Sequence, residues 1–185
     1  VGDAERVAAL KKFVAAFPKT TRLSEAAVLI VTAEASLGHE RLAAGDVDGA
    51  ASFFKKAAND VLAPVSDHLF NDTLIKFPVS LYFRGARLEA IAIARIIASR
   101  SAENATQLLA LASFYLSTEN GSEAKRLAEA AIKIDPNSSA AYQALGLADR
   151  VDFLLDEAAS AFAKAVELEP GSLTAKRGLA EMKRA

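Results

Sequence analysis

A sequence repeat in the second half of the chain constrains its fold more than any other feature. Placing residues 105–138 over residues 139–172 aligns four pairs of identical residues at a constant offset: Leu111 with Leu145, Ala124 with Ala158, Ala131 with Ala165 and Pro136 with Pro170. Proline has no amide hydrogen and disfavours the helical conformation in the residue before it, so Pro136 and Pro170 each end a helix. The repeat therefore predicts two units, each built as helix, turn, helix, turn.

The residue sizes at matching positions of the two units are those that closely packed helices require. Small residues that let helices approach stand at Ala112, Ala124, Ala131, Gly146, Ala158 and Ala165. Larger residues that fill the space between helices stand at Leu108, Leu111, Tyr142, Leu145 and Phe162. Both sets are expected in the core of a helical repeat. A pair of ordinary helical hairpins is the alternative.

The second unit resembles the tetratricopeptide repeat (TPR) family. Leu145-Gly146 stands where the family's first helix carries Leu-Gly, and its second helix is matched by Asp156-Glu157-Ala158, Phe162 and Ala165. The first unit departs from the family at Ala112, in the glycine position, and at Ala128, in the phenylalanine position. The resemblance implies an all-α fold, a right-handed α-α superhelix. This would be a TPR-like solenoid of helix hairpins with one irregular unit in the middle.

A third unit is expected at about 31–63. Its turn and second helix are reproduced by Gly45 to Ala50 together with Phe54 and Ala57, and Leu37-Gly38 precedes them at the expected distance. The sequence thus predicts one TPR-like unit within an amino-terminal helical region, 1–104.

The remaining part of that region, about 64–104, is predicted to be irregular. The separation of Ala50 from Ala124 exceeds two repeat lengths, so extra residues must lie between them. Pro78 falls where a first helix should run unbroken. Two helices are therefore predicted, a short one near 66–76 and a long one over 79–100. The long helix is apolar nearly all round and is expected to be buried on several sides.

Both ends of the chain are predicted to be helical. Residues 173–185 form an amphipathic segment that is expected to cap the solenoid, because an open last repeat exposes its apolar face. Residues 6–17 form a helix ended by Pro18. This opening is similar to that of bacterial envelope repeat proteins of the outer-membrane lipoprotein kind, which implies a bacterial periplasmic or other extracytoplasmic setting, with the cytoplasm as the alternative. The start at Val1 indicates a processed form or a segment of a longer protein.

Composition argues against several classes of protein. The net charge is -1 and no basic stripe appears, so nucleic acid is not an expected partner. Cysteine is absent, which excludes disulfides and thiolate metal sites. The longest apolar stretch, residues 26–33, is far shorter than the ~20 residues of a membrane span. The oligomeric state is not indicated.

No arrangement of residues in the sequence indicates catalysis, a metal or a cofactor. His39-Glu40 lacks a second histidine at position 43, so the zinc-protease pattern fails, and His68 stands in no motif. No glycine-rich phosphate loop occurs. Asp46 and Asp48 lie in a predicted turn without the twelve-residue calcium loop. We therefore expect no enzymatic activity, no cofactor and no metal site.

The TPR resemblance implies a binding surface. In that family the first helix of each unit lines a concave groove, which holds extended peptides or a partner's helix. Helical spacing gives the groove-lining candidates: Thr106, Leu109, Ser113, Leu116, Ala140, Gln143, Leu147, Arg150, Arg177 and Glu181. If exposed, Leu109, Leu116 and Leu147 would form an apolar stripe. Arg150 and Arg177 could pair with acidic groups.

The sequence leaves two functions open. The first is a protein–protein interaction scaffold that binds a peptide or a partner domain in the concave groove. The second is an accessory or targeting region of a larger enzyme whose catalytic domain is absent from this chain. Family members that recognise a chaperone's terminal carboxylate use lysine and asparagine at set groove positions. Here those positions hold Leu109, Ser113, Ala140, Gln143, Ala144 and Leu147, which argues against that subclass.

Overall fold

The computed structural model describes residues 2–184, and every regular element in that range is helical. The chain divides into two compact units, Val1–Ser101 and Ala102–Ala185. Within the described range no helix has the length and apolar character that crossing a bilayer demands. The expectation of a single continuous solenoid across both units stays a prediction.

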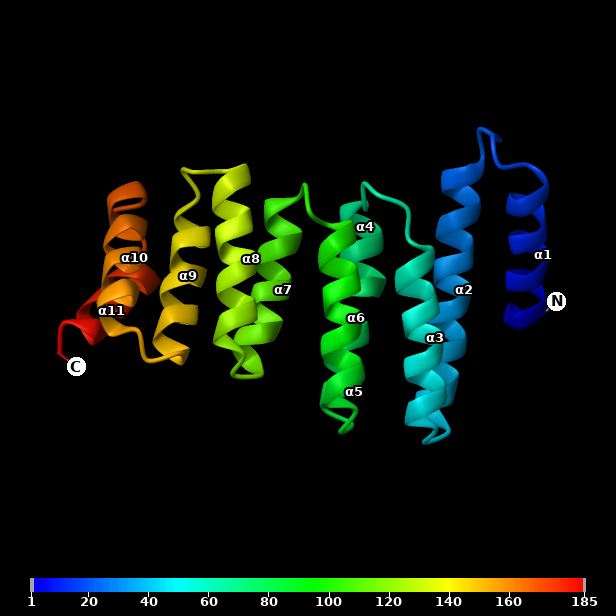
Figure 1. Cartoon of the computed structure of the whole chain (residues 1–185), viewed down its shortest axis with the longest axis horizontal. Helices are drawn as coiled ribbons and strands as arrows, with labels where there is room; N and C mark the ends of the chain where they lie inside the picture. Colours follow the sequence, from blue (N-terminus) through cyan, green and yellow to red (C-terminus); the bar gives the residue numbers. More distant parts are fainter. Residues whose placement is uncertain (1, 185) are drawn as a thin grey trace. The chain divides into compact units, whose positions relative to one another are not determined.

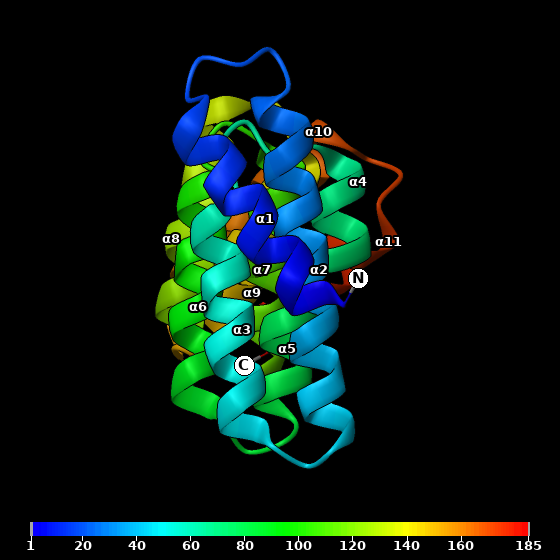
Figure 2. The same ribbon diagram turned by 90° about the vertical axis from the view of Figure 1, so that its right-hand side faces the viewer.

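The first unit, from residue 2 onward, contains six α-helical segments and one π-helical turn. In order these are α1 Asp3–Ala16, α2 Leu23–Ala43, α3 Val47–Asp60, α4 Asp67–Leu69, the π-turn η1 Phe70–Leu74, α5 Lys76–Tyr82 and α6 Arg87–Arg100. The helices α2 and α3 form one hairpin, and α5 and α6 form the next. Figure 2 shows α1 lying in front of the α2–α3 hairpin.

The helix prediction for the irregular segment was wrong in its boundaries. Helical structure starts at Asp67 and extends through η1 and, after the turn residue Ile75, through α5 to Tyr82; residues 83–86 separate it from α6. Gly85 provides that break with a φ of 92°, which glycine adopts without steric cost. Pro78 lies in the first turn of α5, where a missing amide hydrogen loses no intrahelical bond, so it does not end the helix.

Burial of the predicted long helix was also overestimated. Leu88 is 79% exposed, whereas Ile93 and Ile97 are buried. One side of α6 therefore faces the core and another faces solvent, as in an ordinary amphipathic helix.

Residues with positive φ mark the turn inside each hairpin. Gly45, Gly85, Glu119 and Phe153 have φ values of 80°, 92°, 55° and 60°. The interval from Gly85 to Glu119 equals the interval from Glu119 to Phe153, whereas the interval from Gly45 to Gly85 is longer. The extra residues lie in that first interval, a span that includes the loop 61–66 between α3 and α4.

The second unit, up to residue 184, contains two hairpins and a final helix. Its helices are α7 Ala105–Ser117, α8 Gly121–Ile134, α9 Ser139–Val151, α10 Leu155–Leu168 and α11 Leu173–Met182. Figure 1 shows α7 to α10 standing side by side with short turns between them. Side-chain oxygens at Asn104, Asn120, Ser138 and Ser172 cap four of the five amino termini.

Glycine and phenylalanine pack against each other where the two helices of a hairpin cross. Phe54 on α3 and Phe162 on α10 are fully buried. A Cβ at Gly38 would lie 2.6 Å from Cδ1 of Phe54, and one at Gly146 would lie 3.0 Å from the Phe162 ring. Glycine is therefore required at Gly38 for the observed helix separation, since any larger residue would overlap the ring.

Candidate functional site

Helix α9 has two flanks buried against its neighbours and two strips that are open. At about 100° per residue, Ala141, Ala144 and Ala148 fall on one buried flank. Ser139 and Gly146 fall on the other. The two open strips are Ala140, Gln143, Leu147 and Arg150 on one side, and Tyr142 and Leu145 on the other. A candidate binding surface therefore exists on each side of the second unit.

The first strip belongs to the groove predicted from the sequence. Thr106, Ser113, Ala140, Arg150 and Arg177 are exposed. The other predicted side chains, Leu109, Leu116, Gln143, Leu147 and Glu181, are half-buried. The helices that carry them are adjacent, because α7 packs against α9 and α9 against α11. The three leucines thus offer part of their surface between exposed polar neighbours.

Hydrogen bonds hold two polar side chains of this surface in place. Gln143 Nε2 donates to Ser139 Oγ at 3.0 Å, and Ser139 Oγ donates to the Ala165 carbonyl at 3.1 Å. Ser113 Oγ donates to the Leu109 carbonyl one turn earlier at 3.0 Å. Gln143 keeps its amide oxygen available to an incoming backbone amide.

The two predicted arginines already share a carboxylate. Arg150 Nη1 lies 2.9 Å from Glu181 Oε2, and Arg177 Nε lies 2.8 Å from Glu181 Oε1. The Arg177 hydrogen bond is the main cause that lowers the pKa of Glu181. The side chains of Glu181, Arg150 and Arg177 are 38%, 42% and 83% exposed, so solvent screens the pairs and they contribute little stability. Both arginines are thus engaged with Glu181 before any ligand arrives.

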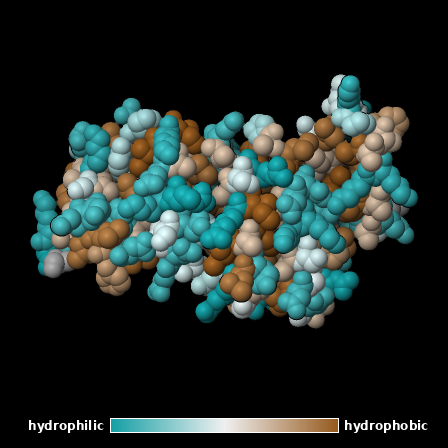
Figure 3. Space-filling view, viewed as in Figure 1, coloured by the Kyte–Doolittle hydropathy of each residue, from teal (hydrophilic) through white to brown (hydrophobic). Residues whose placement is uncertain are grey.

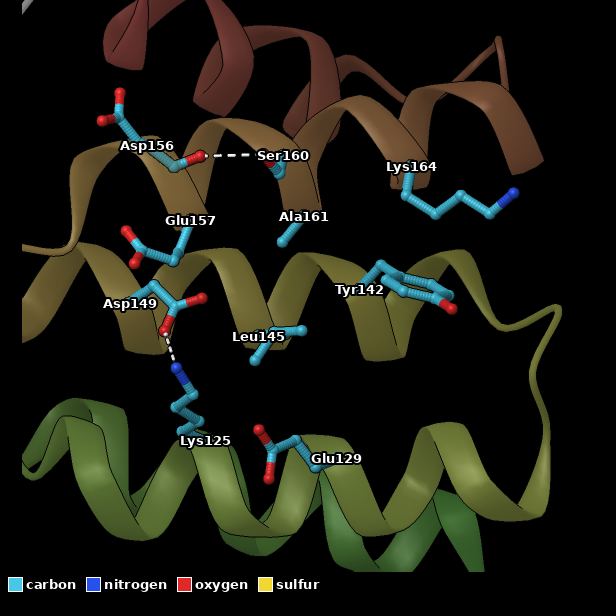
Figure 4. A pocket seen from close by; sticks show the side chains of 10 residues that line it. All are labelled: Lys125, Glu129, Tyr142, Leu145, Asp149, Asp156, Glu157, Ser160, Ala161 and Lys164. Carbon is cyan, nitrogen blue, oxygen red and sulfur yellow. Dashed lines mark hydrogen bonds and ion pairs between the residues drawn. The ribbon is translucent and has the colours of Figure 1, made fainter.

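The second open strip of α9 forms the floor of a shallow pocket that was not predicted from the sequence. Its volume is about 470 Å³, and its lining comes from α8, α9 and α10: Lys125, Glu129, Tyr142, Leu145, Asp149, Asp156, Glu157, Ser160, Ala161 and Lys164. Figure 4 shows Tyr142 and Leu145 lying between the two flanking helices. Figure 3 shows hydrophilic and hydrophobic side chains interleaved over the second unit. We call this surface the α8–α10 groove.

An ion pair with one buried partner, Asp149, lies in the α8–α10 groove. Asp149 is 2% exposed, and its Oδ1 accepts a hydrogen bond from Lys125 Nζ at 2.7 Å. That bond raises the pKa of Lys125, whereas burial lowers it. Electrostatic attraction to Glu129 and Glu157 raises it further. Three successive helices supply the lining, so no local motif signals this site. Tyr142 and Leu145 were expected in the core from the sequence, whereas both are only half-buried and line this groove.

In the first unit a lysine bridges two carboxylates. Lys11 Nζ on α1 lies 2.8 Å from Glu34 Oε1 on α2 and 2.7 Å from Asp60 Oδ2 at the end of α3. Glu34 is 1% exposed. Burial raises the pKa of Glu34 more than the Lys11 hydrogen bond lowers it.

The histidines do not form a catalytic set. His39 packs its ring edge against Phe54, with ring centroids 5.0 Å apart, and burial lowers its pKa. His68 Nε2 lies 3.2 Å from Asp72 Oδ2 on the surface. Among residues 2–184 no group of His, Asp and Glu side chains is placed to hold a metal ion.

Known structures similar to this one are TPR domains. The TPR domain of Sgt2 from Aspergillus fumigatus is 26% identical, with a TM-score of 0.54 over 67% of this chain and 83% of that one. MamA is 22% identical, with a TM-score of 0.53 over 83% of this chain and 81% of that one. The second TPR domain of human RPAP3, solved with the HSP70 peptide SGPTIEEVD, is 25% identical, with a TM-score of 0.51 over 65% of this chain and 100% of that one. No protein-family model and no curated protein sequence matches the chain.

Proposed function

We propose that this chain, which has the all-α TPR fold, is a protein-binding scaffold that holds a peptide or partner segment on the first helices of its second unit. The similar RPAP3 domain binds an HSP70 peptide. That likeness supports a role in binding and not in catalysis.

The observation that carries the proposal is the alignment of open strips on adjacent helices. Thr106 and Ser113 on α7 are exposed, as are Ala140 and Arg150 on α9. Because α7 and α9 pack together, these strips form one surface, and Arg177 extends it onto α11. Exposed side chains gathered on one surface are available to a ligand.

The side chains of the strip favour a ligand that carries both apolar and polar groups. Half-buried Leu109, Leu116 and Leu147 suit apolar side chains, and the anchored Gln143 suits a backbone amide. An extended segment or a helix with alternating apolar and polar residues fits this pattern. A ligand that depends on two free cations fits less well, because Glu181 occupies Arg150 and Arg177.

A matched pair of substitutions tests the proposal. Ala140 on the proposed surface and Ala163 on α10 are both exposed in helices, so glutamate at either position leaves packing unchanged. In a pull-down from source-cell lysate with the chain as bait, Ala140→Glu should lose the partner that the parent captures. Ala163→Glu should retain that partner.

The opposite pattern would contradict the groove assignment. Loss with Ala163→Glu but not with Ala140→Glu would place binding on the other face. Circular dichroism of both variants serves as the folding control. Failure of the folded parent to capture any partner would favour the accessory role beside a catalytic domain.

A further inference from the structure

The α8–α10 groove combines an apolar floor with unpaired acids. Leu145 and Ala161 line the floor beside the Tyr142 ring. Asp156 and Glu157 lie in the first turn of α10, where the helix dipole stabilises them. Within the described part of the chain, no ion pair joins Asp156, Glu157 or Glu129, across the groove on α8, to a neighbouring side chain.

The cations of the groove are already engaged. Lys125 donates to Asp149, and Lys164 Nζ lies 2.7 Å from Glu167 Oε1. Glu129, Asp156 and Glu157 therefore leave the groove with an uncompensated negative charge. A ligand with basic groups and an apolar anchor would be attracted by both features.

The last helix of the same unit has the complementary character. Four basic residues accompany one acid in and just after α11: Lys176, Arg177, Lys183 and Arg184 against Glu181. At about 100° per residue, the basic residues fall on the side of α11 that also carries Leu173, which is 81% exposed. The outer face of α11 is therefore basic and has an exposed leucine.

This basic face cannot reach the groove of its own chain. Ala175 and Gly178 on the inner side of α11 are buried, and a Cβ at Gly178 would lie 2.6 Å from the Phe162 ring. That close contact fixes α11 against α10, with its basic side turned outward. Only another molecule can bring such a helix to the α8–α10 groove.

We propose that the α8–α10 groove binds the basic outer face of α11 from a second copy of this chain. Leu173 of one copy packs on the apolar floor of the other, and Lys176 and Lys183 face the acidic rim. Because groove and helix are different surfaces, the contact is head-to-tail and extends into oligomers. The groove lies on the other side of α9 from the proposed partner-binding surface, and Arg177 is the residue that the basic face of α11 shares with that surface. The contact does not depend on the proposed function, because its charge pairs use Lys176 and Lys183.

Charge reversal with rescue tests this contact. The variant Glu129→Lys with Glu157→Lys reverses the groove, and Lys176→Glu with Lys183→Glu reverses the helix. None of these four residues has an ion-pair partner in the described structure. Each double variant alone should self-associate roughly tenfold or more weakly than the parent in sedimentation velocity. An equimolar mixture should regain the parent's association, because each reversed groove then meets a reversed helix.

Controls separate this contact from a general effect of charge. Glu40→Lys with Glu103→Lys changes net charge equally at exposed positions and should leave association unchanged. Higher ionic strength should weaken association of the parent. If the lysine substitutions unfold α8 or α10, Glu129→Gln with Glu157→Gln removes the same charges with less disturbance. A parent that stays monomeric up to about 1 mM, or a mixture that fails to regain association, would overturn the proposal.

Discussion

At the scale of single residues, two glycines show why this fold restricts its sequence. Gly38 and Gly146 each face a phenylalanine of the partner helix in their hairpin. The Leu-Gly dipeptides were visible in the sequence as a family pattern. Their physical role appears only in the structure, because each partner ring lies on the next helix of the chain.

We predict that Gly38→Ala destabilises the first unit. Alanine favours a helix by up to about 1 kcal/mol over glycine. The clash with Phe54 outweighs that gain, because Phe54 is fully buried and stacks on Phe77 with ring centroids 4.5 Å apart. The net loss in free energy of unfolding should be about 1–3 kcal/mol by chemical denaturation. Gly171→Ala, where a Cβ meets nothing within 4 Å, is the control and should change little. Equal effects at both positions would refute the packing argument.

We predict that Phe153→Gly stabilises the second unit. Phe153 has a φ of 60° and is 85% exposed, so it bears backbone strain while burying little surface. Glycine relieves strain of about 1 kcal/mol but adds entropy to the unfolded chain, which leaves a gain of about 0.5 kcal/mol. Thermal unfolding measures it. Phe153→Ala keeps the strain and should show no gain, and stabilisation by both would point to side-chain exposure instead.

At the scale of elements, α1 has no buried residue and makes a polar contact with both helices of the α2–α3 hairpin. Its contacts are with α2 and, through Lys11, with Asp60. The helix itself was predictable from its apolar spacing and Pro18. The bridge of Lys11 to Glu34 and Asp60 was not, because its members come from three helices.

We predict that this cluster makes stability depend on pH. Since burial raises the pKa of Glu34 above its ordinary 4.5, the folded chain holds that proton more tightly than the unfolded chain. Ionising Glu34 therefore costs stability as the pH rises above 4.5. Glu34→Gln should gain stability relative to the parent between about pH 4 and pH 7, measured by urea unfolding. Glu40→Gln, at an exposed position, is the control. A parent–variant difference that stays constant with pH would show that Glu34 does not titrate in this window.

The helix boundaries show where sequence patterns are enough to predict the ends of the helices. Pro136 and Pro170 end α8 and α10 closely enough to define both hairpins of the second unit. In the first unit Pro78 led to a wrong helix boundary, because a proline in the first turn of a helix and a proline in its middle give the same sequence pattern. The better signal was Gly85, which precedes Glu119, in the matching turn, by one repeat length.

At the scale of the whole molecule, the TPR resemblance is confirmed at the level of the fold. Each similar structure named above covers two thirds or more of its own length in the match. The fold follows from local signals that recur once in each repeat. The α8–α10 groove cannot be predicted from such local signals, because its lining comes from three helices that lie side by side only in the folded chain. The bacterial, extracytoplasmic setting and the single continuous solenoid stay predictions.

The most direct test of the central claim is site-specific photocrosslinking of the captured partner. Benzoylphenylalanine is placed at position 140, on the open strip of α9, or at position 163, on α10, both exposed. The account predicts crosslinks to the partner from position 140 and none from position 163. Crosslinks from position 163 alone would show that the first helices of the second unit are not the binding surface.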